Sequence, residues 1–185
     1  VDEELQILSR LSKDLKFICI QPKISFIKNC LDKYKFSKLL NKLKLEDLNT
    51  KLLSFFSIKK NINYIKFPII VKPRFGRGSR GIHLIKSIIE FNKIHKQINN
   101  YNQWIVQDYI EGDEYTVSVV VDSNSDFAVI PKLIILKEGI TKIAITKRQK
   151  KIYNICSKIV KEVNPKGPFN LQCRISSKNN KVYIF

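Results

Sequence analysis

Residues 72–82, KPRFGRGSRGI, combine a glycine-rich turn with three of the six arginines in the chain. The glycines have the spacing G-x-G-x-x-G, and the arginines lie among them. Glycine lets backbone N–H groups approach a ligand closely, and the planar guanidinium group of arginine suits phosphate oxygens. Like charges in one turn also repel one another unless an anion lies between them. The stretch therefore predicts a loop that covers a polyphosphate, with a surface hairpin turn as the alternative.

The segments on either side of this loop separate it from two well-known kinds of glycine loop. FPIIVK (67–72) and IHLI (82–85) both have the composition of strands, and a helix is predicted only from Ser87, where Glu90 completes a capping box. A dinucleotide-binding fold needs a helix directly after its glycines. A protein kinase has its ATP-binding lysine after the loop, whereas Lys72 precedes this one, and no H-R-D or D-F-G motif occurs.

The rest of the chain has the pattern of helices mixed with antiparallel strands. Helices are predicted from apolar residues at helical spacing, over 2–11, 24–31, 32–45 and 147–163. Strands are predicted from apolar and β-branched runs, over 16–20, 104–110, 114–122, 127–136 and 140–145, with a closing hairpin over 169–175 and 181–185. The segment 46–66 is expected to be an exposed connection because of its polar residues Lys59, Lys60, Asn61 and Asn63.

Composition limits the class of protein. The 185 residues are 44% apolar, enough for one core or two small lobes, and the net charge of +18 raises nucleic acid as a partner. However, 28 of the 34 basic residues are lysines spread along the whole chain, which indicates coding bias more than a binding face. The four cysteines form no C-x-x-C pair, so we expect reduced, mostly buried thiols. Because the chain has no long apolar run and no leader, we expect a cytoplasmic protein. Because it contains no Met, we expect it to be a piece of a longer protein.

Taken in order, these motifs resemble those of the ATP-grasp ligases, and within that family the large chain of carbamoyl-phosphate synthetase. The resemblance extends from about Asp32 to the end of the chain. It implies an α+β ATP-grasp fold, in which ATP lies between two α+β lobes. The implied domains are a remnant of a preceding α/β domain (1–31), a helical start (32–66), a small lobe with the glycine loop (67–110), and a large lobe that is incomplete at its end (111–185).

The resemblance assigns most of the motifs to ATP. Lys33 and Lys72 match two basic residues that bind the phosphates, and the glycine loop matches one that folds over the β- and γ-phosphates. VQDYIEGDEYTV (106–117) is similar to the linker whose backbone contacts adenine, with Glu114 as the ribose acid. An ordinary acidic turn is the alternative for this linker taken alone. The implied ATP-binding set is Lys33, Lys72, Gly76, Arg77, Gly78, Ser79, Gly81, Gln107, Asp108, Tyr109, Ile110 and Glu114.

GPFNLQCRI (167–175) resembles the family's strand that faces the triphosphate and metal, with Asn170 and Gln172 directed at Mg²⁺ or Mn²⁺. Amide oxygens alone are weak ligands for Mg²⁺, which usually takes one or two carboxylates together with phosphate oxygens. By the family's spacing, its metal-binding Glu-x-Asn would begin directly after Phe185. The resemblance also makes Arg80 and Arg174 catalytic candidates, Arg80 toward the phosphoryl group and Arg174 toward the acyl substrate.

The implied reaction is phosphorylation of a small carboxylate by ATP, followed by attack of an amine or ammonia on the acyl phosphate. Such chemistry depends on positioning and on neutralising phosphate charge, which explains a demand for Lys, Arg and backbone N–H groups. Two other interpretations stay open at this point. One is a non-catalytic domain that binds a nucleotide or a partner, and the other is a basic nucleic-acid-binding module. We expect the 185-residue piece by itself to be inactive.

Overall fold

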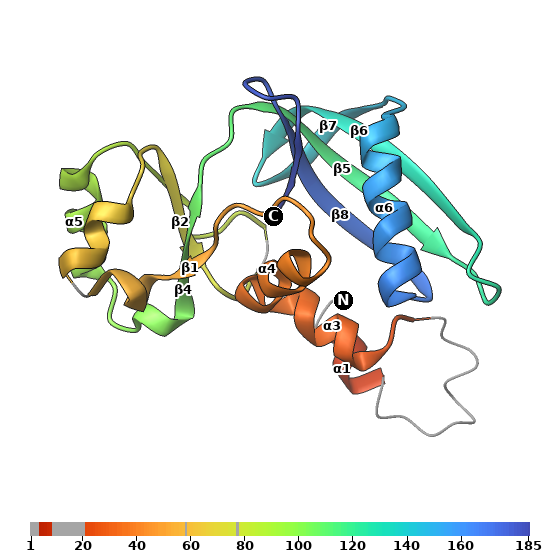
Figure 1. Cartoon of the computed structure of the whole chain (residues 1–185), viewed down its shortest axis with the longest axis horizontal. Coiled ribbons are helices and arrows are strands. Elements are labelled where there is room, and N and C mark those ends of the chain that lie inside the picture. Colours follow the sequence, from red (N-terminus) through yellow and green to blue (C-terminus); the bar gives the residue numbers. More distant parts are fainter. Residues whose placement is uncertain (1–3, 9–20, 58, 77) are drawn as a thin grey trace.

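The computed structural model describes residues 4–8, 21–57, 59–76 and 78–185, which contain two antiparallel sheets. The small sheet has the order β1-β4-β2-β3, with strands β1 (Lys51–Leu52), β2 (Ile69–Pro73), β3 (His83–Ile85) and β4 (Trp104–Asp108). The large sheet has the order β7-β6-β5-β8-β9, with strands β5 (Gly112–Val121), β6 (Phe127–Glu138), β7 (Ile140–Thr146), β8 (Gly167–Ser176) and β9 (Val182–Ile184). Figure 1 shows the small sheet on the left and the large sheet on the right.

Helices cover these sheets and connect them. The α-helices are α1 (Glu4–Leu8), α3 (Ile24–Leu31), α4 (Lys33–Lys42), α5 (Ile88–Gln97) and α6 (Lys150–Val163). Short 3₁₀ helices are η1 (Leu53–Ser57), η2 (Lys59–Tyr64) and η3 (Tyr101–Gln103). We call the small sheet with α5 and the 3₁₀ helices the small lobe, and the large sheet with α6 the large lobe. None of the described helices is both long and apolar enough to cross a membrane.

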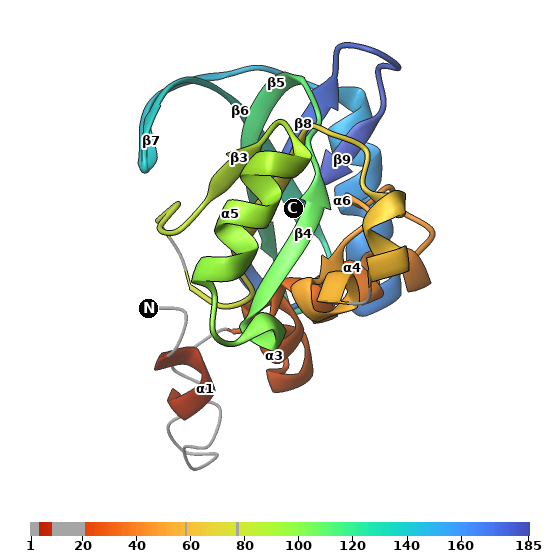
Figure 2. The same cartoon turned by 90° about the vertical axis from the view of Figure 1, so that its left-hand side faces the viewer.

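The small lobe has its own hydrophobic cluster between the sheet and α5. On β2 the alternate residues Ile69 and Val71 are buried in it, together with Phe91 from α5. Figure 2 shows α5 lying across the side of the small sheet that faces away from the large lobe. Alternation along β2 therefore directs Lys72 to the opposite face, toward the large lobe. Ser87 caps α5 as predicted, since its Oγ accepts a hydrogen bond of 3.3 Å from the Glu90 N–H.

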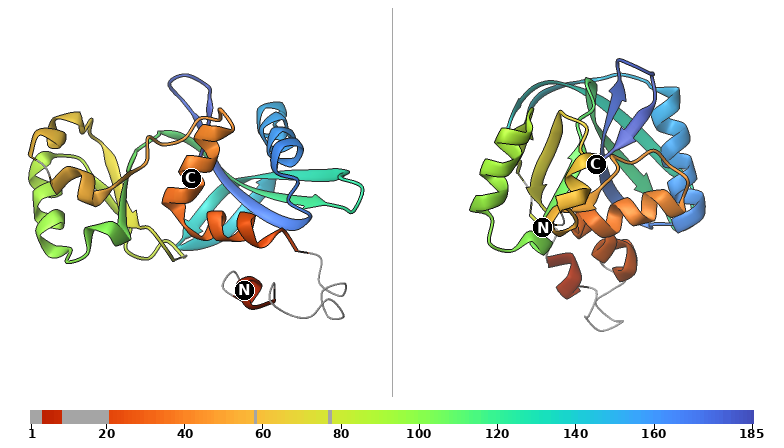
Figure 3. Two further views of the ribbon diagram at one scale, coloured as in Figure 1. Left: turned by 60° about the horizontal axis from the view of Figure 1, so that its bottom comes forward. Right: turned by 60° about the vertical axis from the view of Figure 1, so that its left-hand side comes forward.

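The large lobe has a second, separate cluster. Tyr115 and Val117 are among the alternate residues of β5 that pack against α6, whose Ile152 and Cys156 are fully buried. Phe26 of helix α3, Leu40 of helix α4 and the α4 C-cap residue Leu43 join this cluster too. The intervening residues of β5 and β8 face the other side of the sheet. Figure 3 shows the end of the chain lying between the two lobes, near α4.

The expected exposed connection over 46–66 is wrong in part. This segment contains β1, η1 and η2, and its Leu53 and Phe56 are buried in the small-lobe cluster. Asn61 is also buried, and its Nδ2 donates a 2.7 Å hydrogen bond to the Phe55 carbonyl. The lysines and asparagines suggested a solvated loop, but the apolar residues before them anchor the segment to the sheet. A buried polar side chain is stable there because it is hydrogen-bonded.

Most other predicted elements are present with shifted ends. Helix α4 ends at Lys42 and α6 begins at Lys150, so both are shorter than predicted, whereas β6 extends to Glu138. The predicted strand 16–20 and most of the predicted helix 2–11 lie outside the described residues. Of the cysteines, Cys156 and Cys173 are buried, which raises the pKa of each thiol to about 12, whereas Cys30 is exposed. Two of the three described cysteines are therefore buried, in agreement with the expectation of mostly buried thiols, and Cys19 lies outside the described residues.

His95 on α5 makes the stability of the small lobe depend on pH. Its ring stacks on Tyr101 with 4.2 Å between centroids, and burial lowers its pKa below 6.5. The unfolded chain therefore binds a proton more readily than the folded one as the pH falls below 6.5. We therefore expect the free energy of unfolding to fall as the pH is lowered from 7 to 5, as measured by urea titration. In His95→Phe this dependence should be weaker, while the control His83→Phe should keep it; equal slopes in both variants would contradict the prediction.

Candidate active site

Lys72 lies at the centre of the space between the two lobes. Lys72 is only 6% exposed. No described residue forms a hydrogen bond or an ion pair with its ammonium group. The nearest aromatic ring is that of Phe185, whose centroid is 5.5 Å from Nζ. Burial, together with the positive charges of Lys33 and Lys137, lowers the pKa of Lys72 to about 7, although Glu114 partly opposes the shift. A buried cation among other cations is a site for an anion.

Lys33 is brought to the same place by the start of α4. Asp32 caps this helix, with Oδ1 accepting from the N–H groups of Tyr34 at 3.1 Å and Lys35 at 3.2 Å. The Lys33 Nζ donates a 2.7 Å hydrogen bond to the carbonyl of Gly76, at the start of the glycine loop. Burial lowers the pKa of Lys33, and the Asp32 carboxylate opposes that shift. The two lysines expected to bind phosphate therefore converge on the glycine loop.

The glycine loop connects β2 to β3, as its flanking segments predict, and reaches the large lobe. The Ser79 Oγ donates a 2.9 Å hydrogen bond to the carbonyl of Gly139, in the turn between β6 and β7. Gly81 has a φ of +68°, and a Cβ there would lie 3.1 Å from the Pro73 ring, so a side chain would strain the loop. Arg80 is exposed on the loop. Gly76 and Gly78 also belong to the described loop, whereas Arg77 lies outside the described residues.

Across from Lys72, Glu114 on β5 links two cations of the large lobe. Its carboxylate accepts hydrogen bonds from Lys137 Nζ and Arg174 Nη2. Burial by itself would raise the pKa of Glu114, but these two hydrogen bonds outweigh it and the pKa lies below its usual value. Glu114 therefore stays ionised and partly offsets the positive charge around Lys72. A ribose hydroxyl would have to share this carboxylate with both cations.

Arg174 lies on the linker side of the site. Its Nη1 donates a 2.8 Å hydrogen bond to the carbonyl of Ile110, and its guanidinium carbon lies 5.5 Å from the centroid of the Tyr109 ring and 5.9 Å from that of Phe185. The structure therefore places this predicted catalytic residue against the linker and Glu114. Its Nε is buried and has no described partner.

Lys137 is a site residue that the sequence pattern did not identify. Strand alternation from Lys132, which donates a 2.8 Å hydrogen bond to Ser118 Oγ, would direct Lys137 to the opposite face of the sheet. The pairing of β6 with β7 shifts between Ile134 and Leu136 and again between Leu136 and Lys137. The first shift places an extra residue on β6, a β-bulge that brings both lysines to the same face. Phe185 was likewise missed, because its role depends on tertiary placement.

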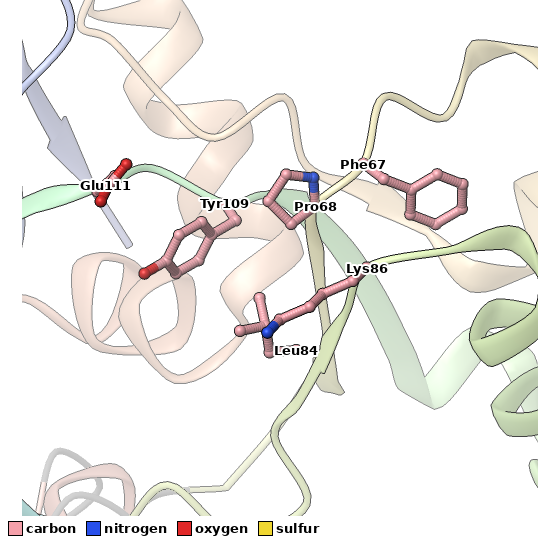
Figure 4. A pocket seen from close by; sticks show the side chains of 6 residues that line it. All are labelled: Phe67, Pro68, Leu84, Lys86, Tyr109 and Glu111. Carbon is pink, nitrogen blue, oxygen red and sulfur yellow. The ribbon is translucent and has the colours of Figure 1, made fainter.

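A pocket of about 420 Å³ opens beside the linker. It is lined by Phe67, Pro68, Leu84, Lys86, Tyr109 and Glu111. Figure 4 shows the side chains of Tyr109, Leu84 and Lys86 converging on one space, while Phe67 extends away from it. Apolar surface combined with a few polar groups suits a planar heterocycle.

The predicted linker residues play different parts in this region. Gln107 is buried, and its Nε2 donates a 2.8 Å hydrogen bond to Thr50 Oγ1, while its Oε1 has no described partner. The N–H of Asp108 donates to the Leu48 carbonyl at 2.9 Å, and that of Tyr109 to the Pro68 carbonyl at 3.3 Å. The N–H of Ile110 makes no hydrogen bond to a described residue. Of these three backbone N–H groups, only that of Ile110 is open to a ligand.

The predicted metal residues Asn170 and Gln172 lie in a polar row on the face of β8 that looks away from α6. The strand pairing sets Asn170 opposite Ser118 and Gln172 opposite Thr116. The Asn170 Oδ1 accepts a 3.1 Å hydrogen bond from Ser118 Oγ, and Gln172 is exposed. No group of three or more His, Cys, Asp or Glu suited to a metal occurs among the described residues. These residues alone therefore do not make a Mg²⁺ site, since its usual carboxylates are lacking.

Comparison with known proteins agrees with this geometry. The ATP-grasp domain family matches residues 30–170. The D-alanine–D-alanine ligase of Fervidobacterium nodosum is 32% identical over 112 residues, which cover 58% of this chain and 34% of the ligase. The carbamoyl phosphate synthase large chain of Buchnera aphidicola is 26% identical over 172 residues, which cover 83% of this chain and 15% of the synthase.

One solved structure shows the likeness in three dimensions. It is the biotin carboxylase domain of 2-oxoglutarate carboxylase from Hydrogenobacter thermophilus, in complex with magnesium ADP, ADP and bicarbonate. The TM-score is 0.74 at 16% identity, over 89% of this chain and 40% of that one. The α+β fold predicted from the sequence is confirmed by this likeness. The chain spans less than half the length of each of these three proteins.

The buried charge of Lys72 leads to a prediction about stability. Its pKa is about 7 in the folded chain and 10.5 in an ordinary environment, so the unfolded state binds more protons between these values. The free energy of unfolding should therefore rise with pH from about 7 to 10.5. We expect Lys72→Met to flatten this rise and to stabilise the ligand-free protein at pH 7 by at least about 1.4 kcal/mol, the equivalent of one pKa unit. Urea unfolding at several pH values tests this, with Lys96→Met as the exposed control; a destabilised Lys72→Met would contradict it.

Proposed function

The chain belongs to the ATP-grasp family, and from this premise we propose that it is the ATP-binding part of a ligase that joins a carboxylate to an amine or ammonia. The reaction proceeds through an acyl phosphate, formed when the carboxylate takes the terminal phosphoryl group of ATP. The amine then attacks the acyl carbon and inorganic phosphate leaves. The role of the whole protein is carbamoyl-phosphate synthase-like in this sense.

The single observation that supports the proposal most is the buried ammonium group of Lys72. It has no described acceptor, and Lys33 and the glycine loop lie beside it. A triphosphate would supply several anionic oxygens to these groups. Neutral sugars or apolar ligands would leave the charge uncompensated, which is costly for a buried cation.

The remaining residues support one orientation for ATP. The pocket beside Tyr109 and Leu84 would hold the adenine ring, and the open N–H of Ile110 would donate to a ring nitrogen. Glu114 would then accept from the ribose, and Lys72 with Lys33 would hold the phosphates. Gly76, Gly78, Ser79 and Gly81 would cover the phosphates from the small lobe, with Arg80 beside them.

Asn170 and Gln172 would contribute amide oxygens to a metal bound chiefly by the phosphate oxygens of ATP, since the described residues supply no acidic cluster for it. A bound magnesium ion supplies positive charge that neutralises the phosphates during transfer. The protein residues hold the reacting groups in line and exclude water. The polar row from Ser118 to Gln172 would form the floor on which the carboxylate substrate lies.

A second candidate function is a domain that binds ATP without turnover. It is favoured by the lack of an acidic metal cluster among the described residues. The two candidates differ in one measurable product. Because the 185-residue piece is expected to be inactive by itself, this product is measured on the whole protein. Magnesium-dependent release of phosphate from ATP in the presence of a carboxylate supports the ligase, and selective ATP binding without release supports the second candidate.

The proposal predicts that Lys72 controls affinity for ATP. In Lys72→Met, calorimetry should give a dissociation constant for ATP at least about tenfold higher, because a charge-assisted hydrogen bond is lost. Lys96→Met, which removes an exposed lysine of the small lobe, serves as the matched control and should bind normally. If the protein binds tripolyphosphate as well as it binds ATP, the site is only a basic patch and the proposal fails.

Binding of ATP should also take up protons at pH 8. The pKa of Lys72 is about 7 without a ligand, so most of the amine is neutral at that pH, and an anion beside it would favour the ammonium form. Affinity should therefore weaken as the pH rises above 7. The uptake is measured by calorimetry in two buffers of different ionisation enthalpy, and it should disappear in Lys72→Met. Equal enthalpies in both buffers for the unaltered protein would contradict the prediction.

A further inference from the structure

Arg74 follows β2 at the base of the glycine loop, where an arginine suggests a phosphate ligand. In the structure its guanidinium group pairs with Asp32, with Nε donating to Oδ1 at 2.8 Å and Nη2 donating to Oδ2 at 2.7 Å, while Nη1 donates to the Asn102 carbonyl at 3.4 Å. This is the bidentate geometry of the strongest arginine–carboxylate pairs. Burial alone would raise the pKa of Asp32, but the hydrogen bonds from Arg74 and from the Lys35 and Tyr34 N–H groups lower it, so the pair stays charged.

Aromatic rings hold the guanidinium group in place. Its central carbon lies 5.5 Å from the centroid of the Tyr34 ring and 5.2 Å from that of Phe75. The Asp32 side chain is 4% exposed and that of Arg74 19%. Water therefore screens this pair much less than an exposed salt bridge. The Nε and Nη2 edge of Arg74, which could hold a phosphate in a fork, is occupied by Asp32 in this arrangement.

The backbone around Arg74 is tied at the same point. Its N–H donates to the Gln103 carbonyl at 2.8 Å, and its own carbonyl accepts from the Lys33 N–H at 3.2 Å. One residue pair thus links β2 of the small lobe to the start of α4. Leu40 of helix α4 and its C-cap residue Leu43 pack on the hydrophobic cluster of the large lobe. The Asp32–Arg74 pair therefore crosses between the two lobes.

This tie acts against a repulsion. Lys33 and Lys72 are close enough for the charge of Lys33 to lower the pKa of Lys72, so the two ammonium groups push each other apart. Lys33 opens α4, and Asp32 directly precedes it. Holding Asp32 against Arg74 keeps Lys33 in place, with its Nζ on the Gly76 carbonyl.

We propose that Arg74 is a positioning residue, which together with Asp32 holds Lys33 against the first turn of the glycine loop so that both lysines meet the same polyphosphate. The inference rests on the proposed ATP site and adds a role that the phosphate-binding residues do not fill. In this role Arg74 neither binds phosphate itself nor acts only to stabilise the fold through its ion pair. Loss of a positioning residue should weaken binding of the phosphate chain and leave binding of the base unchanged.

The test compares ATP with AMP, which carries the base and ribose but lacks the β- and γ-phosphates. For Arg74→Met, calorimetry should give an ATP dissociation constant about tenfold to a hundredfold higher, the effect of losing a charge-assisted hydrogen bond. The AMP constant should change by less than about twofold. Arg74→Lys keeps the charge but not the fork and should recover part of the loss. Asp32→Asn added to Arg74→Met should cost little more, because the pair acts as a unit.

Two further arms keep the outcome clear. Lys96→Met removes one exposed positive charge from the small lobe and should leave both constants unchanged. Hydrogen exchange at the Lys33 N–H measures, without any ligand, how firmly the Asp32–Arg74 pair holds the start of α4. This exchange should become faster in Arg74→Met and in Arg74→Lys. Equal weakening of ATP and AMP, or an unchanged ATP constant, would overturn the inference. If the unaltered protein binds neither nucleotide, the proposed function fails, and unchanged exchange at Lys33 in both variants would overturn the tie separately.

Discussion

An uncompensated positive charge in the space between the lobes governs the site. Lys72 is directed there by strand alternation, because Ile69 and Val71 occupy the other face of β2 in the small-lobe core. Lys33 and Lys137 add charge of the same sign, and among the described residues only Glu114 offsets it. Such an arrangement is unfavourable in the empty protein and becomes favourable when an anion enters. The other structural features of the site hold these lysine side chains near one another despite their mutual repulsion.

Those features come from different parts of the chain. The capped start of α4 and the Asp32–Arg74 pair fix Lys33, while the bulge in β6 turns Lys137 toward Glu114. The pairing of β5 with β8 arranges Asn170, Gln172 and their partners in a row on the same face. Each feature uses local structure to place one polar group. Preorganised polar groups of this kind are what phosphoryl transfer requires.

Much of this could be predicted from the sequence, because the signals were local. Strands on both sides of the glycine loop, the cap at Ser87 and the alternating β5 follow from short-range patterns. Arg74 shows where that reasoning stops. An arginine beside glycines indicates a phosphate ligand, but its partner Asp32 is 42 residues away, and only the fold brings them together. Lys137 could not be predicted for a different reason. Strand prediction assumes that successive side chains alternate between the two faces of the sheet, and a bulge in β6 breaks this alternation.

The burial of Asn61 was mispredicted for a related reason. Polar neighbours indicated solvent, but the cost of burying an amide is reduced when a carbonyl such as that of Phe55 accepts its hydrogen bond. Similarly, Gln107 lies on a predicted strand, yet its side chain is engaged with Thr50 in the interior. Tertiary hydrogen bonds of this kind have no signature in a single sequence.

The two separate hydrophobic clusters have a consequence for how the protein unfolds. Each lobe has its own core, and the charges of Lys33, Lys72 and Lys137 repel one another between the lobes. Cooperative unfolding of the two lobes then depends on a few polar contacts, such as the Asp32–Arg74 pair, and on an anion bound between the lobes. Without a ligand, we therefore expect the small lobe to melt independently of the large one. An anion bound at Lys72 would join the two transitions into one, so that the ligand acts as a structural element of the fold.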